Sequence, residues 1–359
     1  MRALLDELKV QCDLFGPSGF EDEVRAYLKE KVEALGYETT TDALGNLMVE
    51  TGDKTSPYTL MLEAHMDEVG MMITQIEENG LLRFGCVGGI DSRVLCGKAV
   101  TVCGKDKTKI PGVIASKPIH LQSAEERKRV TEASAMYIDI GASTREEAEE
   151  MVDLGDFATF DSAFVLYGSP ETKVKAKAID DRLGCVVLLR VLEKIKDTKT
   201  TLPYHLVVSF GVREEVGFSG AKPSTFRYRP THAIILESTA VADLANVPSH
   251  MRVADQGKGG ALSLADNGTL YDMNMVAFAE KTAEEAGIPV QVKRYVSGGN
   301  NAKHIQQTAA GCKVLALSAP TRYLHSAACV ADTRDCEAID NLVWEMILHF
   351  DKQIRSEEN

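Results

Sequence analysis

The sequence predicts an α/β protein: a doubly wound mixed sheet with helices on both faces, plus an inserted small β-rich domain. Segments of helical periodicity alternate with short apolar strands at both ends of the chain, which is the pattern of α/β sheets. Between about residues 70 and 167 the sequence pattern changes to short β-type runs separated by Gly, Pro and Asp. A length of 359 residues also suits two domains. We therefore expect a discontinuous domain over 1–69 and 168–359, and an inserted domain over 70–167.

The segment before the insertion is predicted to contain one helix and two strands. Apolar residues from Phe20 to Leu35 recur on one helical face, and Gly36 supplies the stop. Apolar runs at 47–50 and 58–62 indicate strands, and the second is apolar enough to be covered on both faces.

The inserted segment is predicted to be mostly β-structure. Its strand-like runs lie at 71–76, 81–84, 98–102, 136–140 and 157–160. One helix interrupts them at 144–152, opened by a capping box from Ser143 to Glu146. The polar stretch 116–134 is expected to form a loop.

Helices and strands alternate again after the insertion. The predicted helices lie at 181–196, 270–286 and 335–355. The predicted strands lie at 206–210, 233–236 and 313–317. This alternation predicts that both ends of the chain build one α/β domain.

The composition disfavours nucleic acid and membrane as partners. The formal net charge of −13 would repel phosphate backbones and anionic lipid surfaces. The apolar run 183–189 ends at Arg190, far short of the roughly 20 residues of a membrane span. The N-terminus does not read as a secretory signal, and the eight Cys contain no C-x-x-C pair. We therefore expect a cytoplasmic protein with reduced thiols.

Potential metal ligands follow several of the predicted strands. Ligands of open α/β sheets bind beyond the carboxyl ends of the strands, so these side chains are expected to converge on one rim. They are His65 and Asp67 after strand 58–62, Glu214 and Glu215 after strand 206–210, Glu237 after strand 233–236, His325 after strand 313–317, and Asp180 just before helix 181–196.

This set of His and carboxylate side chains suits a borderline divalent ion such as Zn, Co or Mn. Two ions about 3.5–4 Å apart, bridged by one carboxylate and one water, would fit it. In the pair Glu214 and Glu215, one carboxylate can bind metal while its neighbour takes the proton from the bridging water. A His with an Asp two residues later, as in His65 and Asp67, suits a ligand and the carboxylate that orients it.

The motifs, in their order along the chain, resemble the tetrahedral (TET) glutamyl aminopeptidase family of dinuclear metallo-aminopeptidases, some of which carry the label cellulase or endoglucanase. The resemblance covers nearly the whole chain. Its motifs are AHMDEVG at 64–70, AIDDRLG at 178–184, REEVG at 213–217 and PTRYLHS at 320–326, with PIHLQSAEERK and DIGAST in the insertion.

The resemblance implies a ligand set for two divalent ions, Zn or Co, with Mn or Ni as alternatives. Asp180 would bridge the ions. His65 and Glu237 would complete one site, and Glu215 and His325 the other. At the position of Glu237 the family more often has Asp, which is one departure from its pattern.

The resemblance also implies that Glu214 is the general base and that Asp67 orients His65. The inserted segment resembles a dimerisation domain, and dimers of this family assemble into a tetrahedral dodecamer. A second departure lies at 297–301, Ser-Gly-Gly-Asn-Asn, where many relatives have an Asp in the turn.

We therefore expect an aminopeptidase that hydrolyses N-terminal residues from peptides with a two-metal-activated water and a Glu base. Two alternatives stay open: a dinuclear amidohydrolase or deacylase acting on a small non-peptide substrate, and a non-catalytic, metal-stabilised assembly protein. A glycoside hydrolase is disfavoured, because its paired carboxylates would not need two His at strand ends.

Overall fold

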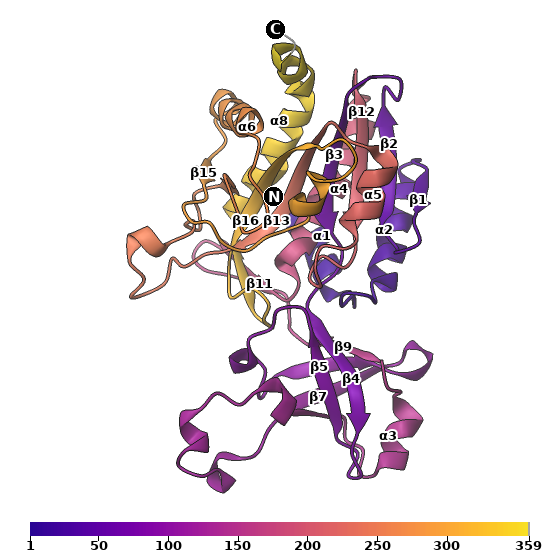
Figure 1. Ribbon diagram of the computed structural model, residues 1–359, viewed down its shortest axis with the longest axis vertical. Helices are drawn as coiled ribbons and strands as arrows, with labels where there is room; N and C mark the ends of the chain where they lie inside the picture. The colour runs from indigo at the N-terminus through magenta and orange to yellow at the C-terminus, as the bar shows by residue number, and fades with distance from the viewer. Residues whose placement is uncertain (358–359) are drawn as a thin grey trace.

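Two hydrophobic cores organise the molecule, one around a large mixed sheet and one inside a small barrel. The computed structural model describes residues 1–357. In Figure 1 the barrel lies at one end of the molecule, and the carboxyl end of the chain lies at the other. The expected fold class, a mixed α/β sheet with a β-rich insertion, is confirmed.

The large sheet contains most of the strands outside the insertion. Its strands are β1 (Thr39–Thr41), β2 (Leu47–Gly52), β3 (Thr59–His65), β10 (Val165–Tyr167), β11 (Lys173–Ala176), β12 (His205–Gly211), β13 (His232–Ala240), β14 (Gly260–Leu262), β15 (Val290–Val292), β16 (Lys313–Arg322) and β17 (Cys329–Asp332). They follow the order β1-β2-β12-β3-β13-β16-β17-β11-β10, with β14 paired to β15 and β16. Because β12, β3, β13 and β16 run parallel, their carboxyl ends meet at one edge.

Helices cover both faces of this sheet (Figure 1). They are α1 (Arg2–Asp13), α2 (Asp22–Ala34), α4 (Ile179–Thr198), α5 (Ala221–Tyr228), α6 (Met273–Ala286), α7 (Ala302–Ile305) and α8 (Thr333–Glu357). Helix α4 packs against β3 and β13 on one side and against α1, α2 and α8 on the other, which explains why its run 183–189 is apolar all round. None of the helices in residues 1–357 has the length and hydropathy to cross a membrane.

The inserted segment forms a closed barrel in the order β4-β5-β8-β7-β6-β9. Its strands are β4 (Gly70–Ile76), β5 (Leu82–Val87), β6 (Ala99–Cys103), β7 (Lys109–Ala115), β8 (Tyr137–Asp139) and β9 (Phe157–Phe160). The expected domain boundaries at 69/70 and 167/168 stay a prediction.

The connections of the insertion carry short helical segments. These are α3 (Arg145–Met151) and the 3₁₀ turns η1 (Ser92–Val94), η2 (Lys105–Lys107), η3 (Ile119–Leu121), η4 (Glu126–Lys128) and η5 (Ala133–Ala135), while η6 (Ser249–Met251) lies in the α/β part. The expected capping box of α3 was wrong by one residue. Thr144 is the N-cap, and its hydroxyl accepts from the N–H of Glu147, whose carboxylate accepts from the N–H of Ser143.

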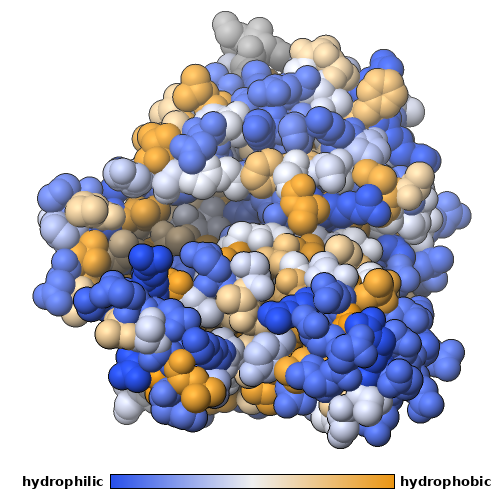
Figure 2. Space-filling model, turned by 60° about the horizontal axis from the view of Figure 1, so that its bottom comes forward, coloured by the Kyte–Doolittle hydropathy of each residue, from blue (hydrophilic) through white to orange (hydrophobic). Residues whose placement is uncertain are grey.

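The surface is mostly hydrophilic, as Figure 2 shows for one face. Apolar side chains are scattered over that face, and a recess opens on its left side.

Candidate metal centre

The first histidine of the site ends strand β3. His65 is 1% exposed, and its Nδ1 lies 3.0 Å from the backbone carbonyl oxygen of Asp67. A carbonyl oxygen can only accept a hydrogen bond, so Nδ1 carries the proton and donates it. The other ring nitrogen, Nε2, therefore faces the site carboxylates and is the nitrogen available to a metal ion.

The carboxylate of Asp67 organises the turn that follows β12. Its Oδ1 accepts from the N–H of Glu214 at 3.1 Å, and its Oδ2 accepts from the N–H of Glu215 at 3.1 Å. The hydroxyl of Ser18 also donates to Oδ2. Oδ1 lies 3.4 Å from Nδ1 of His65 as well. One buried carboxylate thus contacts a histidine and holds the backbone of two adjacent glutamates.

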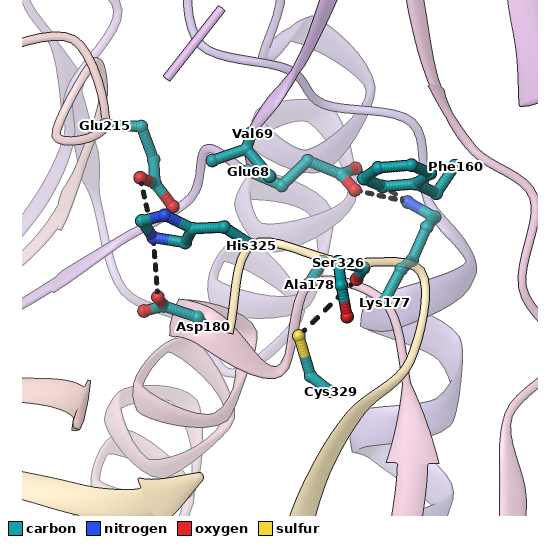
Figure 3. Close-up of a pocket in the computed structure, with 10 residues that line it drawn as sticks. All are labelled: Glu68, Val69, Phe160, Lys177, Ala178, Asp180, Glu215, His325, Ser326 and Cys329. Carbon is teal, nitrogen blue, oxygen red and sulfur yellow. Dashed lines mark hydrogen bonds and ion pairs between the residues drawn. The ribbon is translucent and has the colours of Figure 1, made fainter. Parts of the chain in front are cut away.

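The second histidine, His325, lies in the turn between β16 and β17. Its Nδ1 is 2.8 Å from the carbonyl oxygen of Gly89, which belongs to the inserted segment. By the same argument Nδ1 is the donor, and Nε2 faces two carboxylates, at 3.2 Å from Glu215 and 3.5 Å from Asp180 (Figure 3). The insertion thus orients a side chain of the α/β part.

Asp180 lies between the two histidines. Its Oδ1 is 3.4 Å from Nε2 of His65, and its Oδ2 is 3.5 Å from Nε2 of His325. Although it is the second residue of α4, its φ and ψ of −81° and 106° are not helical. An extended turn at the start of the helix therefore carries a carboxylate that both histidines can share.

The remaining glutamates complete two groups around Asp180. On β13, Glu237 Oε1 is 3.5 Å from Nε2 of His65, whereas Glu215 faces His325. Glu214 Oε2 lies further away, at 4.0 Å from Nε2 of His65. All seven residues singled out in the sequence are thus brought together, and the roles given to them stay predictions.

The donor atoms of the site lack hydrogen-bond partners, and the distances between them suit shared metal ions. Within residues 1–357, His65 Nε2, Asp180 Oδ1 and Glu237 Oε2 are buried without a hydrogen-bond partner, which is costly for polar atoms. Two atoms bound to one tetrahedral zinc ion lie roughly 3.3 Å apart, and the imidazole–carboxylate distances here are 3.2–3.5 Å. The residues present therefore fit divalent metal ions with N and O ligands.

Negative charge is crowded in this site. Burial, and after it the charge of Asp180, raises the pKa of Glu215 to about 8 and that of Glu237 to about 7. Burial and the charge of Glu237 raise the pKa of Glu214 well above its usual range. Burial acts on Asp180 too, but the imidazoles of His325 and His65 outweigh it and lower the pKa of Asp180. A cation among these groups would relieve their repulsion.

A cleft of about 620 Å³ adjoins the site, a size typical of small-ligand pockets. Glu214, Glu215 and Glu237 line one side of it. Of the residues that line it, Lys293 is the one lysine or arginine. Its Nζ donates to the carbonyl oxygen of Ser297 at 2.8 Å, and burial lowers its pKa. Asp91 and Asp266 also line it, so the cleft combines several carboxylates with a single lysine.

Several residues around the site were given no role from the sequence. Glu68 and Arg182 stand inside quoted motifs, so their place in the sequence was a signal that could have been used. Lys293 follows a strand of only three residues, β15, which the sequence analysis did not expect. The contribution of Gly89 is a backbone carbonyl, for which a sequence carries no signal.

Comparison with protein families gives a match over residues 45–342, to the model described as M42 glutamyl aminopeptidase. The glutamyl aminopeptidase of Lactococcus lactis is 30% identical over 326 residues, which cover 90% of this chain and 90% of that protein.

Two solved structures resemble the whole chain. One is a TET aminopeptidase from a marine sediment archaeon of the Thaumarchaeota, with a TM-score of 0.92 and 34% identity over 96% of both chains. The other is the TET1 peptidase of Pyrococcus horikoshii, described as able to assemble into a tetrahedron or a large octahedral shell. It has a TM-score of 0.85 and 33% identity over 96% of this chain and 99% of that one.

Proposed function

This chain belongs to the M42 glutamyl aminopeptidase family and is an aminopeptidase, and we propose that it removes N-terminal residues from peptides with two divalent metal ions. The observation that carries the proposal is the position of Asp180, whose two carboxylate oxygens each face one histidine. One ion would be held by Asp180, His65 and Glu237, and the other by Asp180, Glu215 and His325. Zn or Co suits these ligands best, with Mn or Ni as alternatives.

The chemistry divides between the ions and the residues of the chain. When bound, the ions supply Lewis-acid polarisation of the scissile carbonyl and lower the pKa of the attacking water. Glu214, with its carboxylate 4.0 Å from Nε2 of His65, accepts the proton of that water and passes it to the leaving amine. Asp67 positions this base by accepting from its N–H, and it also orients His65.

The cleft supports a preference for an acidic N-terminal side chain. Lys293 already donates to Ser297, and an ammonium group has three donors. A Glu or Asp side chain of the substrate could therefore accept a charge-assisted hydrogen bond there. The variant Lys293→Met should lower kcat/KM for a glutamyl anilide by about 10-fold or more, since bonds to charged groups contribute about 1.5–3 kcal/mol, while a leucyl anilide should be cleaved as before.

The matched control for this test is Lys281→Met, because Lys281 is an exposed lysine on α6. It should leave both substrates unaffected. Equal losses of Lys293→Met on both anilides would show that Lys293 does not select the side chain.

The barrel is proposed to be a dimerisation domain, with dimers assembling into a tetrahedral dodecamer. Its loops and strands expose apolar side chains at 48–68% of their area, namely Val113, Ile119, Leu121, Val130 and Leu154. Sedimentation should show a dimer or a particle of about twelve chains. A fully active monomer at micromolar concentration would contradict this part of the proposal.

Metal removal tests the main proposal. Exhaustive chelation should abolish hydrolysis of a dipeptide with a free amino group, and re-addition of Zn, Co, Mn or Ni one at a time should restore it to different extents. If the protein stays fully active when elemental analysis finds no metal in it, the proposal is refuted. The N-acetylated dipeptide distinguishes an aminopeptidase from the alternative amidohydrolase. The amidohydrolase would cleave the acetylated dipeptide at the same rate as the dipeptide with a free amino group.

A further inference from the structure

A second charged cluster lies beside the metal centre and is not part of it. Glu68 follows Asp67 in the segment between β3 and β4 and is 2% exposed. Its Oε1 accepts from Lys177 Nζ at 2.6 Å and from Arg182 Nη2 at 3.3 Å. Its Oε2 accepts from Lys177 Nζ at 2.9 Å and from the hydroxyl of Thr159, on barrel strand β9, at 2.8 Å. One carboxylate thus joins two cations of the α/β part to the barrel; its ion pair with Lys177 is drawn in Figure 3.

Both cations are held at a definite position. Arg182 is fully buried and also donates, through Nε, to the carbonyl oxygen of Met66 at 2.6 Å. Lys177 also donates to the carbonyl oxygen of Leu14 at 2.8 Å. Buried charges are tolerated only when they are paired. Glu68 is the carboxylate that both groups share, so its loss would leave two buried cations without their common counter-ion.

Lys177 and Arg182 flank Asp180, the proposed shared ligand, in the sequence. Asp180 comes three residues after Lys177 and two residues before Arg182. Its Oδ1 has no hydrogen-bond partner within residues 1–357, and the nearest imidazole nitrogens lie 3.4–3.5 Å from its two oxygens, so no hydrogen bond fixes Oδ1. The backbone of the segment 177–182, whose two ends are tied to Glu68, therefore contributes to the position of Asp180.

We propose that Glu68 is a positioning residue for the metal centre: it holds the segment that carries Asp180, and through Thr159 it makes the barrel part of that support. The proposal rests on the assignment of Asp180 as a metal ligand. Groups that orient metal ligands typically change metal affinity by 10–100-fold when they are altered. Glu68 itself contacts no substrate and takes no part in the chemical step.

A purely structural role for Glu68 is the competing explanation, and the chain offers a matched control for it. Asp340 is 3% exposed and accepts from Arg190 at 3.1 Å and from Lys194 at 3.0 Å. It is also one carboxylate shared by an arginine and a lysine of α4. Both of these cations lie at least eight residues beyond Asp180, so Asp340→Asn breaks a similar cluster without touching the segment 177–182.

The experiment is a titration of the chelated, full-length protein with Co²⁺, followed by calorimetry and by the visible absorption of the bound ion. Glu68→Gln should weaken Co²⁺ binding by about 10–100-fold and alter the absorption bands, which report ligand geometry. Asp340→Asn should stay within about twofold of the wild type, even if both variants unfold at a lower temperature. Unchanged binding by Glu68→Gln, or an equal loss in both variants, would overturn the proposal.

A milder variant keeps the test decisive if Glu68→Gln does not fold. Thr159→Val is nearly isosteric and removes only the hydroxyl that donates to Glu68. It should weaken Co²⁺ binding several-fold, and wild-type affinity would overturn the proposal. Failure of the proposed metal site has a different signature, because the wild type would then bind no Co²⁺ at all, and failure of the proposed peptidase reaction would leave the expected Co²⁺ affinities of the wild type and of the variants unchanged.

Discussion

The buried carboxyl group of Glu21 is expected to make the free energy of unfolding fall as the pH rises. Glu21 is 3% exposed, and its Oε1 accepts from the N–H of Gly19 at 2.6 Å and of Arg213 at 3.3 Å. Burial, and after it the negative charge of Asp67, raises the pKa of Glu21 from 4.5 to about 7, although the backbone hydrogen bonds act in the other direction. The folded protein thus keeps a proton that the unfolded chain would release.

The sign and size of the effect follow from these two pKa values. Below pH 4.5 the group is protonated in both states, so its contribution to stability is fully present. As the pH rises towards 7 the unfolded chain loses the proton first, and that contribution is lost. One pKa unit corresponds to about 1.36 kcal/mol. Because part of the change falls below pH 5, the loss between roughly pH 5 and pH 8 is about 2.5 kcal/mol.

The variant Glu21→Gln measures this loss, because its amide keeps an acceptor and cannot ionise. Urea unfolding of the chelated wild type and variant at pH 5 and pH 8 gives two differences in the free energy of unfolding. All other titrating groups are common to both proteins and cancel. The difference should move by about 2.5 kcal/mol in favour of the variant at the higher pH. A difference that is the same at both pH values would refute the assigned pKa.

Four further substitutions test the site and the turn beside it. Glu214→Gln should lower kcat by about 10²–10⁴-fold with metal content retained, as expected for a general base; loss of metal together with activity would mean that this residue is a ligand. Asp180→Ala should release more metal, by elemental analysis, than Glu237→Ala, because Asp180 is the proposed bridge between both ions; equal losses would argue against a bridge. Gly220→Ala places a Cβ 1.9 Å from the carbonyl oxygen of Val212. The free energy of unfolding, measured with urea, should therefore fall by about 1–3 kcal/mol. An unchanged free energy would show that this turn can relax.

Long periodic segments were predictable because their patterns follow directly from burial. The predicted helix 335–355 corresponds to α8, and the predicted strand 58–62 to β3, whose seven residues are all buried. Helix α1 was not expected, although Leu4, Leu5 and Leu8 are buried on one face. It has no side-chain cap and ends without a glycine at its C-cap, so the usual signals of its ends are lacking.

Short strands escaped prediction for a different reason. Strands β10, β14 and β17 have only three or four residues, which gives little room for a period of two, although β9, equally short, was predicted at 157–160. Strand β7 contains Pro111 and Gly112, which normally argue against a strand. The pairing of β7 with both β6 and β8 in the closed barrel supplies the stabilisation that its local sequence does not indicate.

The candidate ligands were visible in the sequence because each follows an apolar strand or precedes an apolar helix. Of the groups that contact them, Asp67 was visible as well, because it lies two residues after His65, whereas the backbone partner of His325 was not. His325 is oriented by the carbonyl of Gly89, 236 residues away, and any residue type could supply a carbonyl. The geometry of the ligands is therefore set by tertiary contacts between the barrel and the sheet, which only the fold reveals.

The adjacent carboxylates of Asp67 and Glu68 explain how one short segment can serve two parts of the site. In an extended chain, successive side chains point to opposite sides. Asp67 accordingly reaches the turn of Glu214 and Glu215, whereas Glu68 reaches Lys177 and the barrel. The proposed base and the proposed shared ligand are therefore both contacted from one dipeptide at the junction between sheet and barrel, so a shift of the barrel should act on both together, and the proposed assembly through the barrel is expected to be coupled to metal binding.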